Sequence, residues 1–403
     1  MSTYSIELAG PNTCTGCLAC ADICNHSALM IVKRGELLYP QINKDSCVGC
    51  RLCERACPIV TPVSINSANS IKVRGGWAAD ESLRSSGASG GAFAGIANAF
   101  MTKYQGQVSV YGASLKENRV YHERITSFDD IYLLMNSKYI QSDTRGIYDK
   151  VRKDLKENRH VLFSGTPCQI AGLYGFLGRK RDDTNLLTVE LICAGVMSPE
   201  ALDIHLEINH SKRIISFRSK INGASYCSSQ RTTIEIKGKP FRFEKRDNDI
   251  FYRCFSSSLL ERRSCFDCKF AKLERVADIT IGDFWGGEQD FLDYDKGVNV
   301  ILANNIKADL FLSECNSLVL VKSDLKKAIS GNPYLYNGVN LIKWHPLVIF
   351  PSLSRKILPR KTWVSIVKND TPWSYFWAIY RLLSIGYEKL QYKRTEAKYS
   401  NIL

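Results

Sequence analysis

Cysteines are the residues of this 403-residue sequence best suited to chemistry, and eight of the fifteen fall into two copies of one pattern. In each copy, two residues separate the first three cysteines and three more residues precede a fourth. The copies consist of Cys14, Cys17, Cys20 and Cys24, and of Cys47, Cys50, Cys53 and Cys57. Thiolates spaced this closely bind zinc or iron–sulfur clusters.

This double pattern is typical of bacterial ferredoxins, in which the fourth cysteine of each copy ligates the cluster of the other copy. The sequence therefore predicts two [4Fe–4S] clusters with crossed ligands. One takes Cys14, Cys17, Cys20 and Cys57, and the other takes Cys47, Cys50, Cys53 and Cys24. Two structural zinc sites are the alternative, but zinc rarely needs a third cysteine at this spacing and a crossed fourth.

The segment that carries these cysteines is expected to be a small α+β domain of the ferredoxin type, covering residues 1–62. Gly16 and Gly49 lie between the first two cysteines of each copy, where the chain must turn closely. The short apolar segments at residues 31–32 and 37–39 are expected to form a hairpin between the two halves.

After a Ser- and Asn-rich linker at residues 61–70, strand-like and helix-like segments alternate. The strand-like segments are residues 107–113, 161–164, 186–192, 278–282 and 298–303, and helical patterns cover residues 169–177 and 199–208. Such alternation predicts an α/β domain with a mainly parallel or mixed sheet. We divide this body into residues 70–160 and 161–325, followed by a basic helical tail at residues 326–403.

A Gly/Ser-rich segment at residues 85–91 opens into an apolar, helix-like run and is a candidate phosphate-binding loop. Backbone N–H groups at a helix N-terminus bind phosphate well, although a simple capped turn has a similar composition. No Gly-x-Gly-x-x-Gly follows a strand, so a Rossmann nicotinamide site is not supported. Lys138 could neutralise a pyrophosphate or could be an ordinary surface lysine.

Four further cysteines are candidates for a third metal site: Cys168, Cys193, Cys265 and Cys268. Cys168 and Cys193 follow predicted strands, where α/β domains collect their ligands. Cys265 and Cys268 form a pair separated by two residues. Zinc or unligated thiols remain open as alternatives, and Cys254 could replace Cys168.

Six short motifs occur in a fixed order along the body. They are Ser-Gly-Ala-Ser-Gly-Gly at residues 86–91, Ser-Lys-Tyr at 137–139, Gly-Thr-Pro-Cys-Gln at 165–169, Leu-Ile-Cys at 191–193, Ser-Cys-Phe-Asp-Cys at 264–268 and Ala-Asp-Ile-Thr-Ile-Gly-Asp-Phe-Trp at 277–285. Together they resemble the coenzyme F420 hydrogenase/dehydrogenase beta-subunit family, in the version with a fused ferredoxin domain. The resemblance covers roughly residues 10–310, and bacterial members of this type are often encoded among polysaccharide-synthesis genes.

The resemblance implies bound FAD and a third [4Fe–4S] cluster close to it, held by the four cysteines of the body. It implies flavin contacts from Ser86, Gly87, Ser89, Gly90, Gly91, Lys138, Gly165, Thr166, Gln169 and Asp283. Relatives often carry His-Gly-Val-Pro after the cysteine that matches Cys193, whereas this chain has Ala-Gly-Val-Met at residues 194–197. Because that histidine is missing, the substrate chemistry of relatives is not transferred, and no catalytic residue is assigned.

The formal net charge of +14 is concentrated near the end of the chain, since residues 355–403 hold ten Lys or Arg and three Asp or Glu. No nucleic-acid recognition motif accompanies this charge. An aromatic segment at residues 373–387 could dock against the body, which we favour, or lie on an anionic membrane surface. Because we find neither a signal peptide nor an apolar stretch of about 18 residues, we expect a cytoplasmic protein, with peripheral membrane contact as the second interpretation.

The sequence thus predicts an iron–sulfur flavoprotein oxidoreductase. It would move electrons between a two-electron, small-molecule substrate and low-potential one-electron carriers, with a ferredoxin or a dehydrogenase as redox partner. The alternative is a non-catalytic electron-transfer subunit whose α/β body docks another enzyme.

Overall fold

The computed structural model describes residues 6–34, 36–178, 183–218, 220, 231–244, 248–256, 258, 260–336, 392–400 and 402. The aromatic segment at residues 373–387, for which we weighed docking against membrane contact, lies outside the described residues.

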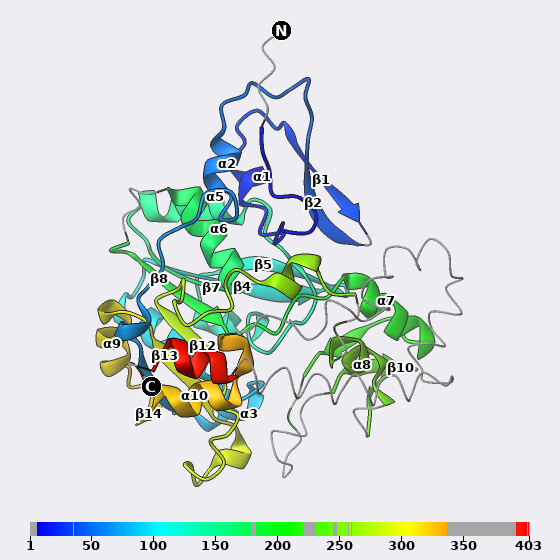
Figure 1. Cartoon of the computed structure of the whole chain (residues 1–403). Coiled ribbons are helices and arrows are strands. Elements are labelled where there is room, and N and C mark those ends of the chain that lie inside the picture. The colour runs from blue at the N-terminus through cyan, green and yellow to red at the C-terminus, as the bar shows by residue number, and fades with distance from the viewer. Residues whose placement is uncertain are drawn as a thin grey trace.

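The N-terminal module is a small α+β unit, as predicted, and lies at the top of Figure 1. Strands β1 (Leu29–Arg34) and β2 (Leu37–Ile42) pair in an antiparallel hairpin. Two short helices, α1 (Ala19–Asp22) and α2 (Leu52–Ala56), begin within the two cysteine patterns.

Below this module lies a nine-stranded mixed sheet (Figure 1). Its strands, in spatial order, are β14 (Leu318–Lys322), β3 (Lys72–Ala78), β13 (Asn299–Ala303), β12 (Ile279–Asp283), β8 (Leu186–Leu191), β7 (His160–Gly165), β4 (Val108–Lys116), β5 (Arg119–Ile125) and β6 (Ser142–Asp143). The central four, β12, β8, β7 and β4, are parallel, and β13, β3, β14 and β5 join them by antiparallel pairing. The predicted α/β domain with a mixed sheet is confirmed, and both halves of the body supply strands to the same sheet.

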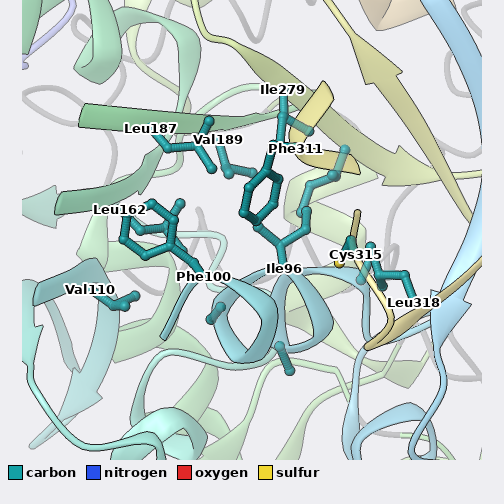
Figure 2. Packing of buried hydrophobic residues seen from close by; sticks show 14 of the residues in the cluster. Ile96, Phe100, Val110, Leu162, Leu187, Val189, Ile279, Phe311, Cys315 and Leu318 are labelled. Carbon is teal, nitrogen blue, oxygen red and sulfur yellow. The ribbon is translucent and has the colours of Figure 1, made fainter. Parts of the chain in front are cut away.

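One face of the sheet is covered by α4 (Ala92–Lys103) and α9 (Ile306–Ser313), with α3 (Glu81–Ser86) just before α4. Figure 2 shows Ile96 and Phe100 of α4 and Phe311 of α9 packed against Leu162 and Val189 from neighbouring strands. Ala92, Ile96 and Phe100 of α4 are buried and lie four residues apart, so they share one face of the helix. This packing fixes the N-terminus of α4 at the edge of the sheet.

The opposite face carries α5 (Ile147–Lys156) and α6 (Pro167–Leu177). Val161 and Phe163 of β7 contact this layer, whereas Leu162 between them faces the other one. A strand buried on both faces favours consecutive apolar residues, here Val161, Leu162 and Phe163, which is why the sequence revealed it.

Two smaller parts complete the fold. A unit beside the sheet contains α7 (Pro199–Ile208), β9 (Ile214–Ser216), β10 (Thr233–Ile236), β11 (Lys239–Arg242) and α8 (Ile250–Ser256). Past α10 (Leu325–Gly331), residues 392–398 are helical, and the Tyr399 hydroxyl donates to Glu274 Oε2 at 2.6 Å. Within the described residues, every helix is too short or too polar to pass through a bilayer.

Arg275 and Glu190 of β8 form a buried ion pair, and their side chains are 1% and 0% exposed. Glu190 also accepts hydrogen bonds from the Thr280 hydroxyl at 2.9 Å and from the backbone N–H of Ala277 at 3.2 Å. A buried charge that loses its partner is strongly destabilising.

We therefore expect Glu190→Gln to lower the free energy of unfolding by about 3–5 kcal/mol, measured by urea denaturation without oxygen. Glu314→Gln is the control, because its ion pair with Lys103 is exposed and worth at most about 1 kcal/mol. Equal losses in the two variants would contradict a special role for the buried pair.

Candidate metal centres and cofactor cavity

Twelve cysteines gather in three sets, each lining its own small cavity. The outer set is Cys24, Cys47, Cys50 and Cys53, the inner set is Cys14, Cys17, Cys20 and Cys57, and the third set is Cys168, Cys193, Cys265 and Cys268. Cys24 and Cys57 each lie with three cysteines of the other copy, which is the crossed arrangement expected from the sequence. The structure thus brings together all twelve predicted ligands in the predicted groups.

The backbone around the outer and inner sets repeats itself. Gly16 and Gly49, at equivalent positions of the two copies, both have a φ of 71°. Leu18 and Arg51, also equivalent, have left-handed φ values of 61° and 59°, a conformation that costs energy in residues with a side chain. Strain repeated at matching positions indicates that the loop shape itself is required, here to turn three thiols toward one centre.

The third set joins separate segments of the body at the carboxyl end of the parallel strands. Cys168 is the second residue of α6, Cys193 follows β8, and Cys265 and Cys268 lie in and just after the 3₁₀ helix Arg263–Asp267. Burial raises the pKa of both Cys168 and Cys193 to about 12. As free thiols these groups stay protonated at neutral pH, so a thiolate here requires a metal centre to stabilise it.

The spacing within the sets does not suit a single metal ion. No three His, Cys, Asp or Glu side chains of the described residues are placed to hold one ion. A zinc ion with Zn–S bonds of about 2.3 Å would need its sulfurs only about 4 Å apart. A [4Fe–4S] cluster has four separate iron atoms, so its four cysteine ligands lie further apart than the ligands of a single ion.

The three sets form a series that ends at a much larger cavity. Cys53 of the outer set and Cys20 of the inner set are close enough for their charges to interact, as are Cys17 and Cys168. Thr15 lines the inner cavity, the third cavity and the large cavity.

Two glycines of α6 allow this helix to approach the N-terminal module. A Cβ atom on Gly172 would lie 2.9 Å from Cys17 Sγ, and a Cβ atom on Gly175 would lie 2.4 Å from the carbonyl oxygen of Ala56. Both distances are shorter than real contacts, so no other residue fits without displacing the module. The helix that begins with Cys168 of the third set therefore also supports the inner set.

The large cavity has a volume of about 500 Å³ and lies where the parallel strands end and helices α4 and α6 begin. In α/β proteins, ligands bind at this edge of the sheet. Eight of the ten residues predicted for flavin line it: Gly87, Ser89, Gly91, Lys138, Gly165, Thr166, Gln169 and Asp283. Ser86 and Gly90 do not; Ser86 ends α3, and Gly90 packs against Gly76 and Asn299.

The Gly87–Gly91 loop brings the N-terminus of α4 to this cavity. The N-cap residue of α4, Gly91, has no side chain to cap the helix, and the first N–H group, from Ala92, donates to the side chain of Asn299 at 3.1 Å. Phe93 and Ala94, the next residues, line the cavity. The positive end of the helix dipole therefore faces the cavity and favours an anionic group there.

Comparisons with known proteins match two segments of the chain. Residues 158–325 match the family model for the C-terminal part of the beta subunit of coenzyme F420 hydrogenase/dehydrogenase. Residues 13–60 match the 4Fe-4S dicluster domain. The beta-subunit domain contains all four cysteines of the third set, and the dicluster domain contains all eight of the outer and inner sets.

A chain from the xenon-derivatised structure of the F420-reducing [NiFe] hydrogenase complex of Methanosarcina barkeri is 14% identical in sequence. The match covers 64% of this chain and 85% of that chain, with a TM-score of 0.43. No curated protein matches the sequence. The beta-subunit and dicluster matches mark an iron–sulfur, electron-transfer protein related to redox-enzyme subunits.

Lys138, which lies outside the matched beta-subunit domain, contributes to the cavity wall. Its ammonium group donates hydrogen bonds to the carbonyl oxygens of Leu133 and Met135, at the end of the 3₁₀ helix Phe128–Leu133. Burial lowers the pKa of Lys138 to about 7. Its predicted interaction with a pyrophosphate stays a prediction.

Asp283, at the end of β12 in the beta-subunit domain, forms an ion pair with Arg218 at 2.7 Å. Both residues line the large cavity, and the Arg218 side chain is 3% exposed. The sequence analysis missed Arg218, because no motif links it to the residues it contacts. Trp285, two residues after Asp283, also lines the cavity.

His122 is a second cavity residue that sequence reasoning missed. Its Nε2–H donates to the Ser164 carbonyl at 3.1 Å, so Nδ1 accepts from the Ser142 hydroxyl at 2.7 Å. Burial lowers the pKa of His122 to about 4, so the ring is neutral near pH 7.

This histidine predicts a pH dependence of stability. Because the unfolded chain binds the proton near pH 6.5 and the folded chain only near pH 4, stability falls as the pH falls below 6.5. The loss assigned to His122 is about 1.4 kcal/mol between about pH 7.5 and about pH 5.5. Urea denaturation at the two pH values should show this slope reduced in His122→Gln, and an unchanged slope would contradict a buried neutral ring.

Proposed function

We propose that the chain is an iron–sulfur flavoprotein oxidoreductase that exchanges two electrons with a small-molecule substrate and single electrons with a protein partner. One observation carries this proposal: Cys168 and Cys193 line both the third cavity and the large cavity. A cofactor in the large cavity would therefore touch the residues that hold the neighbouring cluster. When bound, a flavin supplies the conversion between two-electron and one-electron chemistry that clusters alone lack.

The residues present fit these groups. The outer, inner and third sets would each hold one [4Fe–4S] cluster with four cysteines. The N-terminus of α4, where Phe93 and Ala94 line the cavity behind Gly91, would bind a phosphate of FAD. Thr166 caps α6 and, with Gln169, holds the start of that helix at the cavity wall, between the third set and the space proposed for the flavin.

The outer set is the proposed contact point for the protein partner. Cys50 is exposed, whereas the cysteines of the inner set are buried. Its neighbour Val48 is 55% exposed, and the side chain of Arg51 is 60% exposed. A ferredoxin or a dehydrogenase that touches this surface would lie closer to the outer set than to the inner set or the third set.

The second candidate is a non-catalytic electron-transfer subunit, which the match to a beta-subunit family favours. In that case the large cavity would face another enzyme instead of a substrate. A role in polysaccharide synthesis, a cytoplasmic location, peripheral membrane contact and the domain boundaries stay predictions from the sequence.

Cofactor analysis of protein purified and reconstituted without oxygen tests the proposal. We expect about twelve iron atoms and twelve acid-labile sulfides per chain, and about one FAD that dithionite bleaches. Full iron without flavin, even with added FAD, would favour the non-catalytic subunit. Zinc in place of iron and sulfide would overturn both candidates.

A further inference from the structure

One arginine, Arg262, reaches from the loop of the third set into the loop of the inner set. Its side chain is 1% exposed. Its guanidinium donates to the carbonyl oxygens of Cys14 at 3.1 Å and Leu38 at 2.6 Å, and to Gln141 Oε1 at 3.2 Å. It also stacks on Tyr39, with 4.2 Å from the guanidinium carbon to the ring centre.

The backbone fixes this side chain in place. The N–H of Arg262 donates to the Val196 carbonyl at 2.9 Å, and its own carbonyl accepts from the N–H of Cys265 at 3.0 Å. On the other side, a Cβ atom on Gly16 would lie 2.5 Å from Arg262 Nη2. Gly16 therefore leaves the space that the guanidinium occupies.

The charge of Arg262 lacks a carboxylate partner. All its hydrogen-bond partners are uncharged, and no carboxylate of the described residues forms an ion pair with it. Its Nε–H is buried and has no hydrogen-bond partner among the described residues. A buried cation is costly unless an anion compensates it. A [4Fe–4S] cluster with four thiolates carries negative charge, and the inner set places such a group beside Arg262.

We propose that Arg262 is the buried cation that compensates the negative charge of the inner cluster, and that its charge raises the reduction potential of that cluster. The reason is electrostatic: reduction adds a negative charge, and a nearby cation in a low-dielectric interior stabilises the reduced form. The inference rests on the proposed ligand role of the inner set. Arg262 acts as a positioning and tuning residue and does not touch the substrate.

Apart from Arg262, no buried and unpaired cation among the described residues contacts the cysteine loops of the outer set or the third set. Near the outer set, Arg55 donates to the Cys50 carbonyl at 3.0 Å, but Arg55 is exposed, so water and salt screen its charge. Near the third set, Arg275 is buried, but its charge is paired with Glu190. The charge of Arg262 also acts on Cys168 of the third set, but its guanidinium hydrogen-bonds the loop of the inner set, so the inner set is where its field is strongest.

Redox titration of the anaerobic full-length protein, followed by electron paramagnetic resonance and iron analysis, tests the proposal. We expect Arg262→Gln to lower the reduction potential of one cluster by at least about 59 mV. For one electron, this is a tenfold shift of the equilibrium toward the oxidised cluster. Loss of the same signal in Cys57→Ser would assign it to the inner cluster. Arg262→Lys, which keeps the charge, should stay near the parent value. Arg55→Gln, the matched control at an exposed cysteine loop, should shift no cluster by more than about threefold.

Each result either supports or overturns the proposed effect of Arg262 on the inner cluster. Full iron and unchanged potentials in Arg262→Gln would overturn the proposal, and so would a shifted signal that survives in Cys57→Ser. If Arg262→Gln loses about four iron atoms while Arg262→Lys keeps them, compensation by charge is supported. Loss of four iron atoms in both variants would assign Arg262 a purely structural role and overturn the tuning proposal. A parent protein without iron at the N-terminal sets would instead overturn the proposed function.

Discussion

Replacing Cys193 with serine is expected to lower the iron content from about twelve to about eight atoms per chain. Cys193 lines both the third cavity and the large cavity, so its thiol is a proposed ligand next to the flavin. With that cluster gone, the eight N-terminal cysteines keep their iron, because they lie in a separate module. Iron and acid-labile sulfide analysis of oxygen-free protein measures the difference.

Cys254→Ala is the matched control for this experiment. Cys254 is 1% exposed and burial raises its pKa to about 12, as for Cys193, but it packs in the apolar core of α7 and α8. We expect this variant to keep about twelve iron atoms. Equal iron in the parent and in Cys193→Ser would remove the third cluster from the proposal, and a loss in Cys254→Ala would reassign a ligand.

Gly91→Ala is expected to weaken flavin binding at least tenfold while leaving the iron content unchanged. Gly91 has a φ of 72°, and an added Cβ would lie 2.7 Å from the carbonyl oxygen of Leu83. The backbone must therefore shift at the N-terminus of α4, where we place a phosphate of FAD. Equilibrium titration of the flavin-free protein with FAD, followed by fluorescence, measures the change.

Gly106→Ala provides the control for backbone strain alone. Gly106 has a φ of 83°, but an added Cβ would meet no atom within 4 Å, and Gly106 is not part of the large cavity. This variant carries the cost of a left-handed alanine, roughly 1–2 kcal/mol of stability, without disturbing the loop. Equal FAD affinities in both variants would contradict a phosphate site at α4.

Local sequence patterns predicted the strands that are buried along most of their length. Strands β7, β8 and β12 are largely buried and rich in apolar residues, with only a few polar side chains among them, such as Thr188, Glu190 and Thr280. Strand β3 escaped notice because its sequence contains two adjacent glycines and two basic residues. Its Gly75 lies against the ring of Phe291, so the glycine is explained by a contact that only the folded chain makes.

In the candidate site, too, some residues could be predicted from local sequence and others could not. The outer and inner sets arise from ligand spacing within short loops, which the sequence displays directly. Arg262 lies 248 residues from Cys14, whose carbonyl it contacts, and no spacing rule connects the two. His122 enters the cavity because β5 pairs beside β4, which again depends on the assembled sheet.

The glycines of α6 bear on how freely such redox modules can be exchanged between proteins. Gly172 and Gly175 receive atoms of Cys17 and Ala56 at distances that no larger residue permits. A dicluster domain taken from another protein would need the same surface shape at these two points to sit against α6. The ferredoxin-type domain therefore cannot be replaced by an unrelated dicluster domain without changing its contact surface with α6. We expect chimeras to fold and bind clusters only when α6 is transferred together with the dicluster domain.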